Sequence, residues 1–214
     1  DISNLYAWCE TWFFDNPLSY AHDLYLNGEL VKDLVIPATV PEGVYYDSFI
    51  NWDAFAGGSF ETVTIPSRIK EIGADAFRDR ENLKKVYITD LGAWSGTLFG
   101  NAQANPLYYA HDLYLNGELV KDLVLTETVA DRVYSEWISD MVYGVNNYAF
   151  YNASIETVTV PESIGSLGYN AFAGCENLMK VNISSLQAWS DIDFESAQAN
   201  PLYYAKKLYL DGEK

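Results

Sequence analysis

The feature that most constrains this chain is an internal duplication. Residues 16–36, NPLSYAHDLYLNGELVKDLVI, return at residues 105–125 as NPLYYAHDLYLNGELVKDLVL, with 19 of 21 positions identical. A third copy begins at Asn200 as NPLYYAKKLYLDGEK. Self-similarity at a fixed period is typical of repeat proteins, in which each unit buries its apolar face against its neighbours. We therefore interpret the chain unit by unit.

Each copy contains a hairpin signal. Asn27-Gly28 stands between two short alternating runs, Asn116-Gly117 repeats the arrangement, and Asp211-Gly212 takes its place in the third copy. A type I′ turn needs positive φ at both central residues, which Asn-Gly and Asp-Gly supply at low cost. The sequence therefore predicts a two-residue hairpin in every unit.

Short strands follow at a regular spacing. Residues 33–37, 61–66, 84–88, 156–161 and 180–183 place Val, Leu or Ile at every second position. This alternation predicts half-buried strands. The distance between equivalent valines is 23 residues, from 63 to 86 and from 158 to 181, which lies within the period of a leucine-rich repeat. We expect one strand per turn, stacked in parallel.

The segments between strands carry the pattern I-x-x-I-G-x-x-A-F-x-x-C-x-x-L-x-x-V-x-I-P, and residues 167–183, LGYNAFAGCENLMKVNI, match it closely. This pattern resembles the BspA-type leucine-rich repeats of bacterial surface proteins. Arg80 stands where the pattern has cysteine, and we expect its side chain to lie at an edge with the guanidinium in water.

The resemblance implies a β-rich right-handed leucine-rich-repeat solenoid of BspA-like type, with short helices and inserted β-hairpins. We divide it as one domain, 1–214, with units at about 1–89 and 90–184 and a partial third unit at 185–214. We expect the chain to be a fragment of a longer array. The resemblance also implies a protein exported from a bacterium or held at its surface, acting in adhesion to host or neighbouring cells.

The net charge and the short apolar runs limit the kinds of partner that we expect. Thirteen basic and thirty acidic residues give a net charge of −17, which repels nucleic acid and anionic membranes. The apolar runs are too short to span a bilayer, so we expect no membrane insertion of this stretch. A host extracellular or surface protein is the partner that we expect, with a glycan as the alternative.

Residues for catalysis are sparse. His22 and His111 occupy the same position of the duplicated segment, where the third copy has Lys206, so a catalytic role is not indicated. Cys9 and Cys175 fall in different parts of the repeat, which argues against a disulfide and favours two buried thiols. We expect no enzyme activity, no catalytic or metal-binding residue and no cofactor.

The repeats differ most in the turn that follows each hairpin. From Pro66 to Phe77 the chain runs 11 residues, whereas the equivalent distance is 18 after the first hairpin, ending at Phe55, and 24 after the second, ending at Phe150. The scaffold of a solenoid must repeat, whereas loops on one face are free to vary and often form the binding surface.

The two inserted loops are rich in aromatic residues, which give large and rigid contact area in binding surfaces. We take eight of these as candidate partner-binding residues: Tyr45, Tyr46, Phe49, Trp52, Tyr134, Trp137, Tyr143 and Tyr148. Three functions stay open: a protein-binding adhesion module, a carbohydrate-binding module, and a structural spacer. The aromatic side chains either face a partner or fold back and plug the side of the solenoid.

Overall fold

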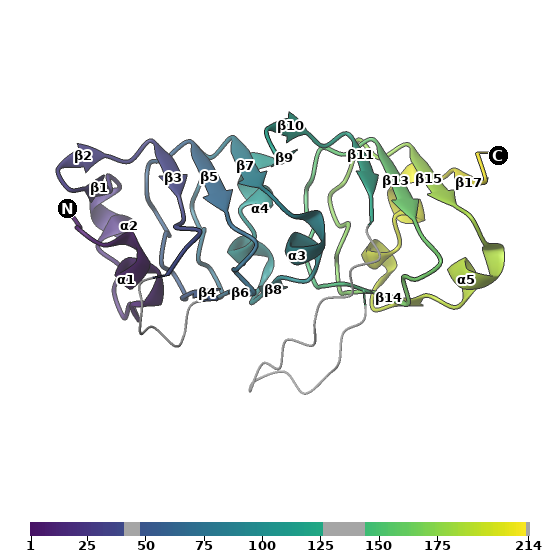
Figure 1. The fold of residues 1–214 in the computed structure, drawn as a ribbon, viewed down its shortest axis with the longest axis horizontal. Coiled ribbons are helices and arrows are strands. Elements are labelled where there is room, and N and C mark those ends of the chain that lie inside the picture. The colour runs from purple at the N-terminus through teal and green to yellow at the C-terminus, as the bar shows by residue number, and fades with distance from the viewer. Residues whose placement is uncertain (41–47, 126–143, 213–214) are drawn as a thin grey trace.

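The computed structural model describes residues 1–40, 48–125 and 144–212, and it shows an elongated stack of turns (Figure 1). Two rows of strands follow one another along its upper side, and the strands within each row are parallel. The first row holds β3 (Asp33–Val35), β5 (Thr62–Ile65), β7 (Lys85–Ile88) and β9 (Asp112–Leu115). The second holds β11 (Asp122–Val124), β13 (Thr157–Val160), β15 (Lys180–Ile183) and β17 (Leu208–Leu210).

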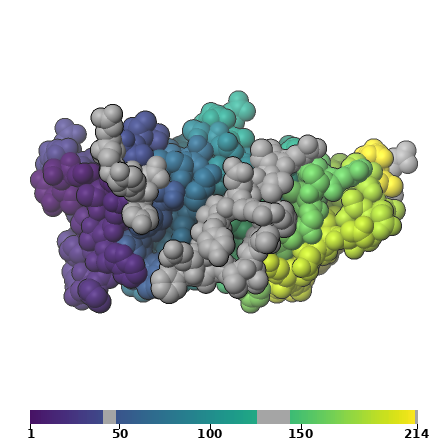
Figure 2. Space-filling model, turned by 60° about the horizontal axis from the view of Figure 1, so that its bottom comes forward, coloured from purple at the N-terminus to yellow at the C-terminus, as the bar shows by residue number. Residues whose placement is uncertain are grey.

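The lower side carries a matching pair of short parallel sheets. One contains β4 (Phe49–Ile50), β6 (Glu71–Ile72) and β8 (Leu98–Phe99), and the other contains β12 (Gly144–Val145), β14 (Ser166–Leu167) and β16 (Asp193–Phe194). From β3 to β9, and again from β11 to β17, the chain passes once through the lower layer between consecutive upper strands, whereas between β9 and β11 it does not. Figure 2, with the lower side turned forward, shows the turns following one another along a single long body. This architecture confirms the leucine-rich-repeat solenoid.

The alternation of the strand sequences sets their register. Val63 pairs with Leu34 on one side and Val86 on the other, and Val86 pairs with Leu113. These side chains are all buried, whereas the intervening Thr and Tyr positions are partly exposed. One inward apolar residue at each level therefore forms a continuous apolar column along the stack.

The Ala-Phe signature fills the interior between the layers. Phe55 stacks on Phe77 at a centroid distance of 5.6 Å, and Phe150 stacks on Phe172 at 5.5 Å. All four rings are fully buried. Each ring pair thus joins two neighbouring turns inside the solenoid, where the stacked rings add to the apolar burial.

The hairpins form as expected. β1 (Tyr25–Leu26) pairs antiparallel with β2 (Glu29–Leu30), and β9 pairs antiparallel with β10 (Glu118–Leu119). The central residues have φ of 52° and 85° at Asn27 and Gly28, as a type I′ turn requires. Because β10 occupies the free edge of β9, the hairpin ends the first upper row, and β11 starts a new one.

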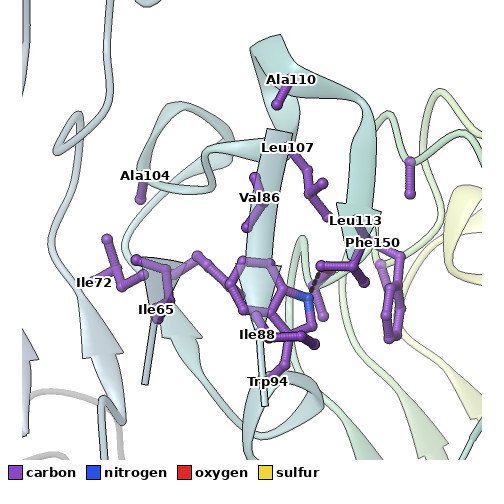
Figure 3. Close-up of a cluster of buried hydrophobic side chains, with 14 of the residues drawn as sticks. Ile65, Ile72, Val86, Ile88, Trp94, Ala104, Leu107, Ala110, Leu113 and Phe150 are labelled. Atoms are coloured by element: carbon purple, nitrogen blue, oxygen red, sulfur yellow. Dashed lines mark hydrogen bonds between the residues drawn. The ribbon is translucent and has the colours of Figure 1, made fainter. Parts of the chain in front are cut away.

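Short helices lie before the first upper row and between consecutive strands within both rows. They are α1 (Leu5–Glu10), α2 (Leu18–Ala21), α3 (Leu91–Ser95), α4 (Leu107–Ala110), α5 (Leu186–Ser190) and α6 (Leu202–Ala205), with 3₁₀ turns at Ala102–Ala104 and Ala197–Ala199. Trp94 of α3 is buried with Leu107, Leu113 and Phe150 around it (Figure 3), and its Nε1 donates to the Ala149 carbonyl at 2.8 Å. Trp8 of α1 makes the same bond to Ala54 at 2.7 Å. In the first two units the recurring tryptophan therefore joins a helix to the following turn.

A buried asparagine also joins two turns within each of the first two units. The Asn105 Nδ2 donates to the carbonyls of Tyr148 and Ala149 at 2.7 and 3.1 Å, and its Oδ1 accepts from the Leu107 N–H at 2.9 Å. Asn16 has the equivalent partners in the first unit. Part of the duplicated segment therefore serves to hold the turn before the hairpin on the turn that follows it.

The expectation for Arg80 is wrong. Its side chain is buried, with the residue 3% exposed, and the guanidinium lies 5.0 Å from the Phe60 ring centroid while donating to the Asp79 carbonyl. Burial lowers the Arg80 pKa to about 10. Gly58 leaves space beside it, since a Cβ there would lie 2.9 Å from Arg80 Nη1. The small residue on the neighbouring turn lets the long side chain lie inside the stack.

The two thiols are buried and unpaired, as expected. Burial raises the pKa of both Cys9 and Cys175 to about 12, and the Cys175 Sγ donates to the Phe150 carbonyl at 3.1 Å. Because the thiolate is the reactive form, we expect neither cysteine to react with a thiol reagent at pH 8 in the folded protein. Both should react at once in denaturant, as titration with a chromogenic disulfide would measure. Fast labelling of the folded protein would contradict this assignment.

Candidate functional site

The described part of the chain contains three of the eight candidate residues. Phe49 lies in β4, Trp52 follows that strand, and Tyr148 follows β12. Tyr45, Tyr46, Tyr134, Trp137 and Tyr143 lie outside the described residues. Phe49 pairs with Glu71 in the lower sheet and is partly buried.

Trp52 forms an exposed aromatic pair with Trp12. The ring centroids are 5.3 Å apart with a tilt of 54°, and the residues are 54% and 66% exposed. The Trp52 backbone N–H donates to Asn51 Oδ1 at 2.8 Å, which fixes the start of the turn. Its ring edge lies over Gly73, where a Cβ would come within 2.2 Å of Cδ1. Because Gly73 has no side chain, the indole can pack against its backbone while much of the ring stays exposed to solvent.

Tyr148 belongs to a cluster of tyrosines. Its ring lies 5.8 Å from that of Tyr169 and 6.0 Å from that of Tyr151, and Tyr151 stacks on Tyr108 at 5.4 Å. Tyr109 adjoins Tyr108 at 4.8 Å. We call these five residues the tyrosine cluster. Tyr169 is 46% exposed and the other four are partly exposed, so the cluster offers ring edges and hydroxyls at the surface.

Neighbouring groups hold the cluster in place and keep the hydroxyls of two of its members protonated. The Tyr109 hydroxyl accepts from the Asp79 N–H at 2.9 Å and from Gln103 Nε2 at 3.1 Å. Burial, followed by the neighbouring phenols, raises the pKa of Tyr148 and of Tyr151 above the usual value for tyrosine. Both hydroxyls therefore remain protonated at neutral pH and can donate hydrogen bonds.

At one position of this cluster the first unit has a charged residue in place of a tyrosine. Asp53 occupies the position of Tyr148, and Arg78 bridges it to Asp75 through N to O distances of 3.1 and 3.3 Å. Partial burial, opposed by Arg78, raises the Asp53 pKa. The same side of the solenoid thus carries ion pairs in one unit and aromatic rings in the next.

Sequence reasoning did not identify Trp12, Tyr108, Tyr109, Tyr151 or Tyr169 as candidate residues. One signal was present, because Tyr108 replaces Ser19 at one of the two positions that differ between the duplicated segments. The other residues come from turns that only stacking brings together. The three described candidates do not form one site, since Trp52 and Tyr148 lie in different units.

The described residues offer little for catalysis. His22 and His111 place Nδ1 within 2.8 Å of the Gly57 carbonyl and 3.1 Å of the Asn152 carbonyl, at equivalent turns of the two units. Within residues 1–40, 48–125 and 144–212, no group of three or more His, Cys, Asp or Glu side chains is arranged to hold a metal ion. In the same residues, no helix has the length and apolar character needed to cross a membrane.

Comparison with protein families gives one match. Six copies of the "BspA type Leucine rich repeat region" match residues 47–104 and 137–208, which is more than half of the chain. We find no match among curated proteins.

Solved structures give weaker similarities. A leucine rich cell surface protein from Faecalibacterium prausnitzii A2-165 is 24% identical over 72% of this chain and 48% of its own, with a TM-score of 0.35. A leucine-rich repeat protein from Bacteroides ovatus ATCC 8483 is 22% identical over 70% and 39%, with a TM-score of 0.39. The leucine rich repeat protein of T. pallidum is 19% identical over 72% of both chains, with a TM-score of 0.38. The chain spans less than half the length of the first two.

Proposed function

Because the chain belongs to the BspA-type leucine-rich repeat family, we propose that it is a non-catalytic protein-binding module, displayed on a cell surface or secreted, that takes part in adhesion. Its partner is an extracellular or surface protein of a host or neighbouring cell. The aromatic residues on the side of the solenoid make the contact.

The observation that carries this proposal is the exposed aromatic surface. Isolated apolar residues at a protein surface need no explanation, whereas grouped tryptophan and tyrosine rings are typical of binding hot spots. The Trp12 and Trp52 pair and the tyrosine cluster both place rigid rings at the surface of a stable scaffold. Rings held by the scaffold lose little conformational entropy when they bind.

Variation between units supports the same proposal. Core positions repeat from turn to turn because every turn must bury the same face. Tyr148 takes the place of Asp53, and Tyr151 and Tyr169 take the places of alanines in the first unit, so packing of the repeat does not demand the cluster. The aromatic residues of the two inserted loops remain part of the proposed surface as a prediction from sequence.

The test is a binding screen followed by substitution. Immobilised extracellular matrix and cell-surface proteins, together with a glycan array, are probed with the labelled chain. We expect binding to at least one protein. Trp52→Ala and Tyr148→Ser should each weaken that binding by about tenfold or more where the ring is a hot spot, while circular dichroism stays unchanged.

Tyr87→Ala serves as the matched control, because this partly exposed tyrosine lies on the upper sheet beside Tyr114 and away from the lower strands. Its binding should equal that of the wild type. Binding to glycans alone would replace the proposal with a carbohydrate-binding function. If the chain binds no protein, or if none of the aromatic substitutions alters binding, the proposal fails and a structural spacer remains.

A further inference from the structure

The upper rows of strands are interrupted at the second hairpin. Within the described residues, β10 pairs with β9 alone and β11 pairs with β13 alone, so the two rows are not joined by a ladder (Figure 1). A groove of about 610 Å³ lies at this break, between the hairpin, the start of α3 and β11. Only Val120 and Lys121 connect β10 to β11.

Among the residues that the structure describes, backbone groups on both sides of the groove have no strand partner. The Val120 N–H donates to the Leu113 carbonyl, so the alternate residue Leu119 directs its N–H and C=O away from β9. On the other side the Leu125 N–H donates to Thr159, and Asp122 and Val124 therefore turn their backbone groups away from β13. Two open strand edges face this break, and such edges are templates for a further strand.

The side chains of the groove indicate what such a strand would contain. Leu119 and Val124 are 37% and 55% exposed, although both line the groove. Carboxylates of Asp90, Glu118 and Asp122 surround them. The one cation of the lining, Lys121, already donates to the Ser154 carbonyl at 3.2 Å and pairs with Glu156 at 3.5 Å. The groove is thus apolar in its lining and negative in charge.

We propose that this groove binds an extended segment of a partner protein by strand addition, and that the segment alternates apolar residues with lysine or arginine. Main-chain hydrogen bonds to β10 and β11 supply affinity, as in other cases where a peptide extends a sheet. The alternation of the segment places its apolar side chains on one face and its cations on the other. This site is separate from the aromatic surface and does not depend on it.

The first unit has the same open edges. β2 pairs with β1 alone and β3 pairs with β5 alone, and the exposed Leu30 and Val35 match Leu119 and Val124. Glu29 stands in the place of Glu118. Substitutions that test the site are therefore made in both units at once.

The experiment uses a fluorescein-labelled peptide of alternating lysine and valine, with anisotropy measured at physiological salt. A second peptide has the same sequence but carries a methyl group on every other backbone nitrogen, so it keeps its charge and loses the donors needed for the ladder. We expect the first peptide to bind and the methylated one to bind at least about tenfold more weakly.

Two double variants distinguish binding of the peptide in the groove from general attraction of a cationic peptide to an acidic protein. Glu29→Lys with Glu118→Lys should weaken binding by about tenfold or more, whereas Glu81→Lys with Glu176→Lys makes the same charge change at exposed positions elsewhere and should have little effect. Val35→Pro with Val124→Pro removes the outward N–H groups and should also weaken binding. Absence of binding, equal binding of both peptides, or equal loss in both charge variants would overturn the proposal.

Discussion

Replacing Phe150 with alanine is expected to lower the free energy of unfolding by about 3–5 kcal/mol, the usual cost of removing a fully buried ring. Phe150 is 0% exposed and stacks on Phe172 at 5.5 Å, so the substitution removes both apolar burial and a ring contact. Its backbone carbonyl also receives the Cys175 thiol, which fixes the neighbouring turn around the ring. Urea unfolding followed by circular dichroism measures the loss.

Phe14→Ala is the matched control for this result. Phe14 has a relative exposure of 106%, so the same change should alter stability by no more than about 0.5 kcal/mol. Phe150→Leu should fall between the two, because leucine refills part of the cavity. If Phe150→Ala and Phe14→Ala cost the same, the phenylalanine stack is not the core of the solenoid.

Replacing Asn105 with alanine is expected to destabilise the junction between its own turn and the turn that follows β12 by about 1–3 kcal/mol. The substitution removes two donated bonds and one accepted bond from a fully buried side chain. It leaves the buried Leu107 N–H without its partner, and such a group carries its full desolvation cost. The two carbonyls keep other donors, the Tyr151 N–H and Trp94 Nε1, which limits the loss.

Asn200→Ala isolates the part of this effect that belongs to the junction. Asn200 occupies the same place in the third copy and accepts from the Leu202 N–H at 2.9 Å, while its Nδ2 has no partner among the described residues. The difference between the two substitutions therefore reports the two bonds that Asn105 donates to the turn after β12. Because repeat arrays gain stability from interfaces between neighbours, hydrogen exchange should show faster opening around residues 144–150 in Asn105→Ala. Equal effects of the two substitutions would remove Asn105 from the junction.

Much of the fold could be predicted because its determinants are local. The dipeptide Asn27-Gly28 favours positive φ at both residues because of its own side chains. In the same way, valines at alternate positions favour a half-buried strand in every turn that has them. The period of 23 residues then follows from residues that each turn repeats. The repeat family and the solenoid are confirmed on this basis.

The candidate site could be predicted only in part. The inserted loops directed attention to Trp52 and Tyr148, both of which reach the surface at least partly. Trp12 is 40 positions from Trp52, and Tyr108 is 43 positions from Tyr151, yet each pair is in ring contact. Neither contact follows from local propensity, since each depends on which turns lie side by side.

The sequence alone determined the period, the hairpins and the inward residues, because turn chemistry and alternation act over a few neighbouring positions. The tertiary structure decided three further things: where the hairpin interrupts the upper sheet, which tyrosines meet, and that Arg80 lies inside beside Gly58 and Phe60. These depend on the space that an adjacent turn leaves free and on which strand edge is already paired. Both are set only when the turns stack.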